Sequence, residues 1–442
     1  MGKKTIVNVR IVSSNGISDN CDIFIDDDRI TAIHKHGIIK PEGDIFDGKG
    51  HLALPGMVDI HFHAGLGSIE SVYRDMEVES KAAAAGGFTY LRSHLIIGKE
   101  AANGYGSKIE DIIKNTEKVS TVDFSFNPMI GNTKQAEELD ILIRKGINAF
   151  KIYYSAYKGK EGADLGIYVD DNIDDVVFET LNRASKYDRT RIIFHAEDGN
   201  IVKHFTKLEI KKRANGLKAF SNGRPTIAEI TKINEVCSLA TALNAKIHIA
   251  HISSIEAFNS VMKWKNRGLD VTMETEPHYL AFDYSMWKRI GIYGKVNPPL
   301  RGPEDRKFLI SMISKRMLDS ISTDTNTFTK SEKTNGEDKY GNIWNARPGF
   351  DNIQLVLPFL ITNFVKRNIL TFETLVWLTS ERPSKIIYAH QKGAIFPGMD
   401  ADLSIININD EKIPSEKNTI YSPGIEWTPF ANKKMTGFPE MV

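Results

Sequence analysis

The chain has 442 residues, of which 41% are hydrophobic and 26% charged, and its formal net charge is +1 at pH 7. This balance gives no reason to expect nucleic acid or a membrane surface as a partner. Only two cysteines are present, which argues against a disulfide framework and favours the cytoplasm. No apolar run reaches the roughly 18 residues of a membrane-spanning helix. We expect a soluble protein built as a large barrel or as two to three domains.

Residues 1–52 contain short β-branched runs, such as "TIVNVRIV" and "CDIFIDD", separated by Asp, Asn and Gly turns. This pattern predicts the hairpins of a small sheet. Residues 391–442 return to strand-like alternation in "KGAIFPGMDADLSIININ". We therefore expect the two ends of the chain to form one small β-sandwich domain.

Between residues 53 and 390, apolar strand candidates alternate with longer amphipathic stretches. The strand candidates are 56–63, 88–95, 122–129, 148–154, 191–198, 246–253, 270–276 and 319–325. Eight strands with intervening helices predict an α/β fold, a (β/α)8 TIM barrel. Residues 158–169 and 327–349 are expected to be loops that follow strands, where barrel active sites are built.

Candidate metal ligands fall at the ends of these predicted strands. His61 and His63 in "DIHFH" are two residues apart, so both side chains project from one face of a strand. An HxH pair alone is weak evidence for a metal site. The other candidates at or near strand ends are Lys151, His195, His251 and Asp324. The carboxyl ends of barrel strands converge on one rim, so we expect these residues to meet there.

The number of candidate ligands indicates two metals rather than one. A single tetrahedral zinc requires fewer ligands than these positions offer. Two divalent metals roughly 3.5–4 Å apart would use them all, with a bridging anion between the metals. Lys151 can supply that anion if its deprotonated amine reacts with carbon dioxide to form a carbamate. Lysine pKa values fall readily under burial and near cations, which makes this chemistry accessible.

Each candidate also has a structural interpretation when it is taken alone. A single barrel lysine is more often an ion-pair partner, and a single buried histidine is more often a hydrogen-bonded structural residue. Asp324 could equally cap a loop or a helix. His248 lies three residues from His251 in the same predicted strand, so we expect it to face the opposite side and to be structural. The joint occurrence of the candidates on one rim is what favours the metal site.

Several longer motifs occur in a fixed order along essentially the whole chain. They include "DGKGHLALPGMVDIHFH", "FKIYYSAYKG", "FHAEDGN", "IAHISS", "ETEPHYL", "KVNPPLRGPEDR" and "ISTD". With these motifs, the chain resembles the cyclic-amide hydrolases of the amidohydrolase superfamily, which include dihydropyrimidinases and hydantoinases, dihydroorotases and allantoinases. The resemblance implies a metal-dependent hydrolase that opens the C–N bond of a cyclic amide or imide.

The resemblance also implies roles for individual residues. The implied metal ligands are His61, His63, Lys151, His195, His251 and Asp324, with N6-carboxylated Lys151 bridging two divalent ions. Zinc is the expected ion, although manganese, cobalt or iron also suit these ligands. Asp324 would in addition shuttle a proton. A homodimer or homotetramer is expected from the resemblance alone.

The implied substrate contacts come from a tyrosine and two asparagines. Tyr157 matches the tyrosine that contacts the substrate carbonyl, although one extra residue separates it from Lys151. That offset leaves Tyr153 and Tyr154 as weaker candidates. Asn297 and Asn345 match positions that hold the ring amide.

The chain departs from the family pattern at several positions. Dihydroorotases carry an arginine just after the HxH pair, where this chain has Ala64 and Gly65. Most relatives carry a histidine after the catalytic aspartate, where this chain has Thr325. Arg92 and His94 are unexpected at the end of strand two and are candidates to compensate. "FKIYYSAYKG" favours a dihydropyrimidinase or hydantoinase, and "KVNPPLR" is closer to dihydroorotase.

Alternatives to this reading remain at the level of sequence. A dihydroorotase or an allantoinase is the alternative within the family. A metal-free, non-catalytic scaffold homologue is the alternative of another class, and the presence of every metal ligand argues against it. A mononuclear deaminase on the same barrel generally lacks the strand-four lysine, so Lys151 argues against that reading.

Overall fold

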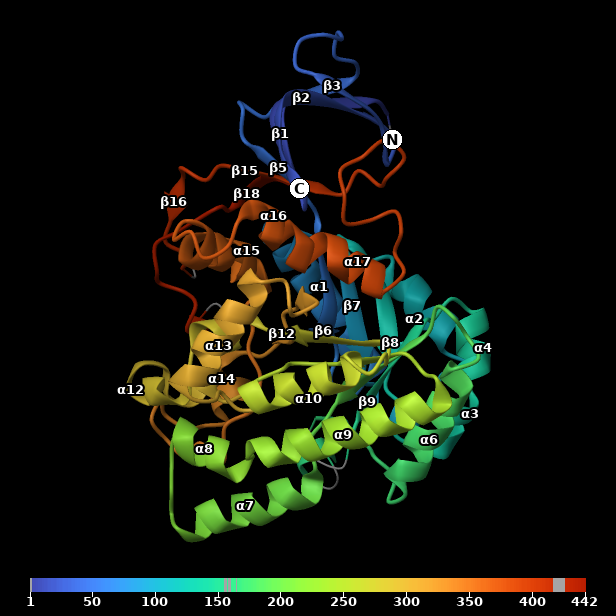
Figure 1. The fold of residues 1–442 in the computed structure, drawn as a ribbon, viewed down its shortest axis with the longest axis vertical. Helices are drawn as coiled ribbons and strands as arrows, with labels where there is room; N and C mark the ends of the chain where they lie inside the picture. Colours follow the sequence, from blue (N-terminus) through green and yellow to red (C-terminus); the bar gives the residue numbers. More distant parts are fainter. Residues whose placement is uncertain (1, 155–156, 158–159, 164, 416–425) are drawn as a thin grey trace.

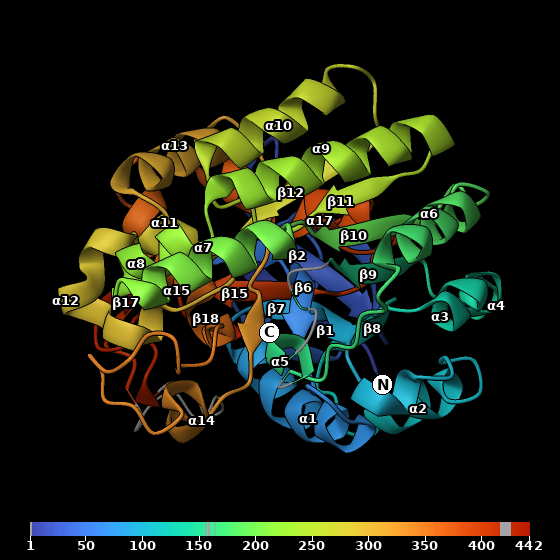
Figure 2. The same ribbon diagram turned by 90° about the horizontal axis from the view of Figure 1, so that it is seen from below.

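Parallel strands form a closed barrel at the centre of the molecule (Figure 2). This computed structural model describes residues 2–154, 157, 160–163, 165–415 and 426–442. The barrel strands are β6 (Met57–His63), β7 (Phe88–Leu95), β8 (Asp123–Pro128), β9 (Ala149–Tyr153), β10 (Arg191–His195), β11 (Ile247–Ile249), β12 (Val271–Thr275), β13 (Ser320–Ile321) and β14 (Thr325–Asn326). They fall within or overlap the strand candidates from the sequence, and the predicted TIM barrel is confirmed.

The pairing of the strands shows how the ring closes. One sheet has the order β14-β6-β7-β8 and the other the order β13-β12-β11-β10-β9. A parallel bridge between Met129 and Lys151 joins β8 to β9. The eighth strand is split: β13 pairs with β12, whereas β14 pairs with β6. The chain therefore changes partner between Ile321 and Thr325, and Asp324 lies in that break.

Helices cover the outside of the barrel (Figures 1 and 2). Those that follow barrel strands are α1 (Ile69–Ala85), α2 (Ile109–Thr116), α3 (Thr133–Glu137), α4 (Leu139–Arg144), α6 (Ile173–Ala184), α9 (Thr226–Leu243), α10 (Ile255–Lys265) and α13 (Pro303–Ser314). Further helices lie in the connections: α5 (Lys160–Ala163), α7 (Gly199–Lys211), α8 (Leu217–Gly223), α11 (Pro277–Ala281), α12 (Trp287–Ile290), α14 (Lys330–Thr334), α15 (Val356–Leu360), α16 (Phe372–Val376) and α17 (Arg382–Ile386). The segment 327–349, expected to be a loop, thus contains the short helix α14. None of the described helices has an apolar stretch long enough to cross a membrane.

The two ends of the chain meet in one β-domain beside the barrel (Figure 1). Its seven-stranded sheet contains β1 (Lys4–Ser13), β2 (Gly16–Asp26), β3 (Arg29–Lys35), β4 (Asp44–Asp47), β5 (Leu52–Pro55), β15 (Leu403–Ile406) and β18 (Pro439–Met441). A separate hairpin consists of β16 (Glu411–Lys412) and β17 (Met435–Thr436). The expected pairing of the two ends is confirmed. Strand β5 pairs with both β1 and β15, so this sheet extends to Pro55, slightly past residue 52.

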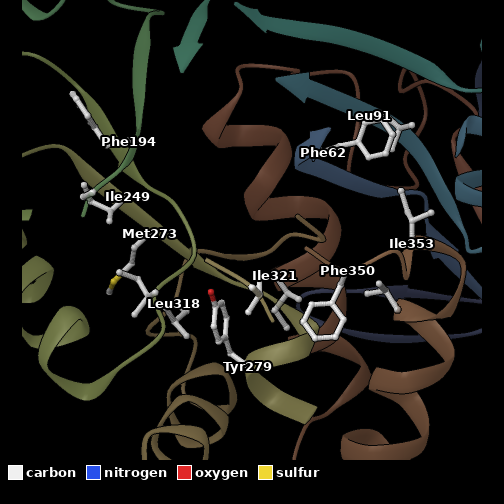
Figure 3. Close-up of a cluster of buried hydrophobic side chains, with 14 of the residues drawn as sticks. Phe62, Leu91, Phe194, Ile249, Met273, Tyr279, Leu318, Ile321, Phe350 and Ile353 are labelled. Carbon is white, nitrogen blue, oxygen red and sulfur yellow. The ribbon is translucent and has the colours of Figure 1, made fainter. Parts of the chain in front are cut away.

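The hydrophobic core lies between the barrel strands and the surrounding helices. Figure 3 shows Phe62, Leu91, Phe194, Ile249 and Met273 among the buried side chains of this core. Successive side chains of a strand point to opposite faces. Because Phe62 packs into the outer core, its neighbours His61 and His63 face the barrel interior, and the outward Phe194 places His195 inside in the same way.

Candidate metal centre

Four buried histidines lie close together inside the barrel. Strand β6 supplies His61 and His63, strand β10 ends with His195, and His251 follows β11. The ring centroids are 5.3 Å apart for His61 and His63, 5.4 Å for His61 and His251, and 4.4 Å for His195 and His251. The strand order therefore brings together the histidines that the sequence suggested as ligands.

Two of these histidines are held by buried carboxylates. Nδ1 of His61 lies 2.5 Å from Oε1 of Glu274, so the Nε2 atom faces the centre. Nε2 of His195 lies 2.6 Å from Oε2 of Glu197, and Arg224 donates to the same oxygen at 2.6 Å. A carboxylate on one imidazole nitrogen fixes the ring and leaves the other nitrogen for a metal. Each ring is thus oriented as a metal ligand requires.

Asp324 completes the side of the centre that His61 and His63 form. Its Oδ1 atom lies 2.9 Å from Nε2 of His63 and 3.2 Å from Nε2 of His61. Burial alone would raise the pKa of Asp324, but the neighbouring imidazoles outweigh burial and hold that pKa well below its usual range. The side chain is therefore a carboxylate at neutral pH, the form that binds metals and accepts protons.

The backbone is strained at two of the candidate ligands. Asp324 has φ 47° and His251 has φ 44°, both in the left-handed region. Such a conformation costs a non-glycine residue on the order of 1–3 kcal/mol and is concentrated at functional sites. His251 was expected within strand six, but β11 ends at Ile249 and this turn directs His251 inward.

Lys151 lies in β9 with its amine fully buried among these groups. Its Nζ has no hydrogen-bond partner among the described residues and lies 5.0 Å from the centre of the Tyr153 ring. Burial lowers the pKa of Lys151 to about 8, although the nearby carboxylates of Glu274, Asp324 and Glu276 act in the opposite direction. An amine in this position is more easily deprotonated than an ordinary lysine.

A small cavity of about 40 Å³ opens beside these ligands and contains two of the predicted substrate contacts. Tyr157 lines it with its ring 4.8 Å from that of His195. The Asn297 amide donates to the Tyr157 hydroxyl at 3.3 Å, and both side chains are buried. Tyr153 also lines the cavity, whereas the Tyr154 hydroxyl donates to Asp174 and Glu235 outside it.

Asn345 does not reach this cavity in the structure. Its side chain is exposed and donates to Glu337 at 2.7 Å. Asn326 lines the cavity instead, with its amide donating to the Asp324 carbonyl at 2.9 Å. Hydrogen bonds within the segment after strand eight decide which asparagine reaches the cavity, and a sequence motif does not show them.

Several buried polar residues around the centre were not anticipated. Glu274 and Glu197 hold His61 and His195. They occur within the motifs "ETEPHYL" and "FHAEDGN", but no role was predicted for them from the sequence. His248 was expected on the side opposite His251, but its Nε2 lies 3.3 Å from Glu274, so it also faces the interior. The short strand β11 and the turn at His251 account for that difference. A carboxylate near the end of a barrel strand was the signal that could have identified both glutamates.

The residues that depart from the family pattern occupy defined places. Gly65 has φ +73°, and a Cβ atom there would lie 2.3 Å from the Val72 nitrogen. Arg92 is buried and donates to Asn148, so it does not line the cavity. His94 lies within 4.5 Å of His61 and 5.1 Å of His63, measured between ring centroids. Of the two unexpected strand-two residues, only His94 reaches the centre.

Comparison with known proteins identifies the family to which the chain belongs. No protein-family model matches the chain. A dihydroorotase of Methanothermobacter thermautotrophicus is 30% identical over 421 residues, which cover 95% of this chain and 88% of that protein. A dihydroorotase of Bacillus subtilis is 29% identical over 441 residues, covering 98% and 95%. The chain belongs to the cyclic-amide hydrolases of the amidohydrolase superfamily.

Solved structures show the same architecture for this cyclic-amide hydrolase. The L-hydantoinase of Arthrobacter aurescens superimposes with a TM-score of 0.86 at 24% identity, covering 99% of this chain and 94% of that one. A D-hydantoinase superimposes with a TM-score of 0.84 at 25% identity, covering 99% and 93%. The expected barrel with a β-sandwich domain is confirmed, and the chain is a hydrolase of a metal-dependent family.

The side chains of this hydrolase fit a metal centre. The buried Nζ atom of Lys151 has no hydrogen-bond partner among the described residues. Buried polar atoms are nearly always paired in folded proteins, so such atoms indicate a missing partner. Imidazole nitrogens with a carboxylate oxygen are a donor set that zinc and related divalent ions accept.

Proposed function

We propose that this enzyme hydrolyses the ring C–N bond of a neutral cyclic amide or imide, of the dihydropyrimidine or hydantoin kind. The observation that carries the proposal is the backbone at Gly65. A side chain at this position would collide with the backbone of Val72, because a Cβ atom would lie 2.3 Å from its nitrogen and 2.5 Å from its Cα atom. The positive φ of +73° disfavours a side chain as well. An arginine for a substrate carboxylate therefore has no place here.

The rest of the cavity lining supports a neutral substrate. The described residues that line the cavity include no lysine and no arginine. The side chains that are not candidate ligands are mainly apolar or aromatic: Leu66, Ile96, Tyr153, Tyr157, Leu165, Ile167, Val296 and Pro348. A carboxylate buried against such a surface would lose hydration without gaining a charged partner, which is strongly unfavourable. The polarity of this lining suits a neutral ring with an apolar substituent better.

Lys151 would bridge two divalent metals, for which zinc is the expected ion, as an N6-carboxylate. The lysine amine attacks carbon dioxide, a nitrogen–carbon bond forms and one proton is released, which leaves two oxygens. The other ligands would be His61, His63, His195, His251 and Asp324. When bound, the metals would supply a hydrolytic nucleophile at neutral pH and polarise the ring carbonyl.

Asp324 and Tyr157 would carry the steps that belong to the chain itself. The Asp324 carboxylate would accept a proton during the attack and then deliver it to the ring nitrogen, which must be protonated to leave. The Tyr157 hydroxyl, held by Asn297 at 3.3 Å, would donate to the carbonyl oxygen as negative charge develops on it. Loss of one such donor typically costs about 3–4 kcal/mol in the transition state.

The test is a comparison of substrates on protein reconstituted with zinc. We expect kcat/KM for dihydrouracil or a 5-substituted hydantoin to exceed that for dihydroorotate at least 100-fold. A higher value for dihydroorotate would overturn the neutral-substrate proposal. Hydrolysis of none of these rings, with two metals bound, would overturn the proposal of a cyclic-amide hydrolase. Allantoin in the same series tests the remaining neutral member of the family.

Dihydroorotate is the second candidate because the most similar curated relatives reported above bear the name dihydroorotase. The motif "KVNPPLR" also resembles that group. This reading requires another cation for the substrate carboxylate. The basic residues of the neighbouring pocket are Arg224, Lys295 and Arg347, and this pocket shares Leu165 and Pro348 with the cavity. Loss of dihydroorotate turnover in the single variant Arg347→Met would favour dihydroorotate as the substrate.

A further inference from the structure

We propose that His94 is an additional ligand of the metal that His61 and His63 hold, an inference that rests on the proposed metal centre. One nitrogen of each of these three histidines lies within 4.8 Å of the others, and all three side chains are buried. The ring of His94 is 4.5 Å from that of His61, which matches the 4.4 Å between His195 and His251. The rings of His94 and His61 are therefore about as close to each other as the rings of His195 and His251, two of the proposed ligands.

The strand register explains why His94 reaches this point. Strand β7 runs parallel to β6, and Ser93 lies opposite Phe62. Ser93 accepts a hydrogen bond from the Ala64 amide at 2.9 Å, and the next side chain along the strand, His94, points to the other face. That face is the barrel interior, where His61 and His63 also lie.

The two nitrogens of His94 have different surroundings. Nε2 is buried and has no hydrogen-bond partner among the described residues. Nδ1 lies 3.1 Å from the side-chain amide of Asn127. Metal-bound histidines usually have a hydrogen-bond partner on the second nitrogen, as His61 has Glu274 and His195 has Glu197. His94 also has a partner on its second nitrogen, but the atom that faces it is the Nδ2 atom of the Asn127 amide, a donor where the carboxylates are acceptors.

The Asn127 amide determines which nitrogen of His94 can bind a metal. An amide oxygen that faces Nδ1 accepts its proton and leaves the lone pair on Nε2. The oxygen and nitrogen of an amide occupy equivalent places and are assigned from their partners. Oδ1 of Asn127 has no partner among the described residues. Rotating the amide group by 180° therefore breaks no hydrogen bond to that oxygen. The metal-bound form therefore requires the Asn127 oxygen to face His94.

A crystal structure of the zinc-loaded protein tests the inference directly and does not depend on a variant. We expect Nε2 of His94 at about 2.0–2.1 Å from the zinc bound by His61 and His63, the usual zinc–imidazole distance. Separation beyond about 3 Å, with zinc on His61 and His63, would overturn the inference and leave the proposed function intact. Absence of zinc from both positions would overturn the proposed metal centre itself.

Metal affinity of His94→Gln gives a second test that is independent of turnover. We expect the affinity of one of the two sites for zinc to fall at least 10-fold, with a changed visible spectrum of the cobalt-substituted protein. His51→Gln is the control, because His51 pairs with Glu440 at 3.0 Å in the β-domain and not in the barrel interior. Unchanged zinc affinity and an unchanged cobalt spectrum in His94→Gln would contradict a ligand role.

Discussion

At the scale of single residues, the chemistry proposed for Lys151 depends on the burial of its amine. Substitution Lys151→Ala should abolish hydrolysis and reduce the zinc content, because the bridging oxygens are lost. A short carboxylic acid such as propionate should restore part of the activity by occupying the space of the missing group. Turnover and metal content would be measured together. Lys145→Ala, at a partly buried lysine that bonds Gly106 and Glu110, is the control and should keep both. Full zinc content with unchanged turnover in Lys151→Ala would refute the bridging role.

The pKa of Lys151 also predicts how the centre assembles. Carboxylation needs the neutral amine, and the pKa of this amine is lowered to about 8 by burial. The rate at which metal-free protein regains activity with bicarbonate and zinc should therefore rise as the pH increases towards 8 and then level off. With an ordinary lysine, the reactivation rate would keep rising until the pH reached the lysine pKa of about 10.4. Reactivation rates between pH 6 and 10, measured at constant dissolved carbon dioxide, distinguish the two profiles.

Glu274 and Glu197 both hold a histidine, but their substitutions should have different effects. Glu274→Gln should lower zinc affinity by about 10- to 100-fold, because the partner that orients His61 is weakened. Glu197→Gln should in addition cost about 3–5 kcal/mol of stability, since it removes the carboxylate from the buried Arg224 charge. Zinc titration and urea unfolding of the metal-free variants separate the effects. Equal unfolding free energies would contradict this distinction.

At the scale of the elements, Lys392 connects the barrel to the β-domain. Its ammonium lies 2.5 Å from Asp123 at the start of β8, and 2.9 Å and 2.7 Å from Asp400 and Asp402 before β15. The three carboxylates raise the pKa of Lys392 despite its burial. This lysine therefore occupies a cluster of acidic residues that could otherwise be mistaken for a cation site.

Substitution Lys392→Met should destabilise the protein by about 3 kcal/mol, because the carboxylates lose their shared counterion. Urea unfolding of the metal-free protein measures the change. The control Lys385→Met removes an exposed i,i+4 pair with Glu381 and should change stability by no more than about 0.5 kcal/mol. Similar losses in the two variants would argue against a special role for the Lys392 cluster.

The elements also show what the sequence could and could not reveal. The succession of short apolar runs and longer amphipathic stretches was enough to find the barrel strands, and the HxH spacing placed His61 and His63 on one face. The contact between His61 and Glu274 joins residues 213 positions apart, and it exists only because the barrel closes. The break in strand eight and the position of Asn345 outside the cavity likewise depend on contacts in the folded chain, which a local sequence pattern does not encode.

At the scale of the whole molecule, metal binding should stabilise the fold. The candidate ligands come from strands β6, β9 and β10, from the segment after β11 and from the break in strand eight, so unfolding would dismantle every one of their contacts. Zinc at 100 times its dissociation constant should add about 2.7 kcal/mol per site. For a chain of this length that corresponds to a few degrees in Tm. Calorimetry of metal-free and zinc-loaded protein measures the shift, and Lys151→Ala should show a smaller one.

The break in strand eight has a further consequence for how the centre can be observed. The Asp324 amide donates to the His61 carbonyl at 2.9 Å. Asp324 lies where the eighth strand changes its pairing partner from β12 to β6. Metal bound by both side chains would hold this break in strand eight against β6 from the barrel interior. Its loss would leave only the hydrogen bonds of the chain itself, such as that from the Thr323 hydroxyl to Asp59 at 2.6 Å. Hydrogen exchange at this single amide would then report whether the centre is assembled, without any substrate being present.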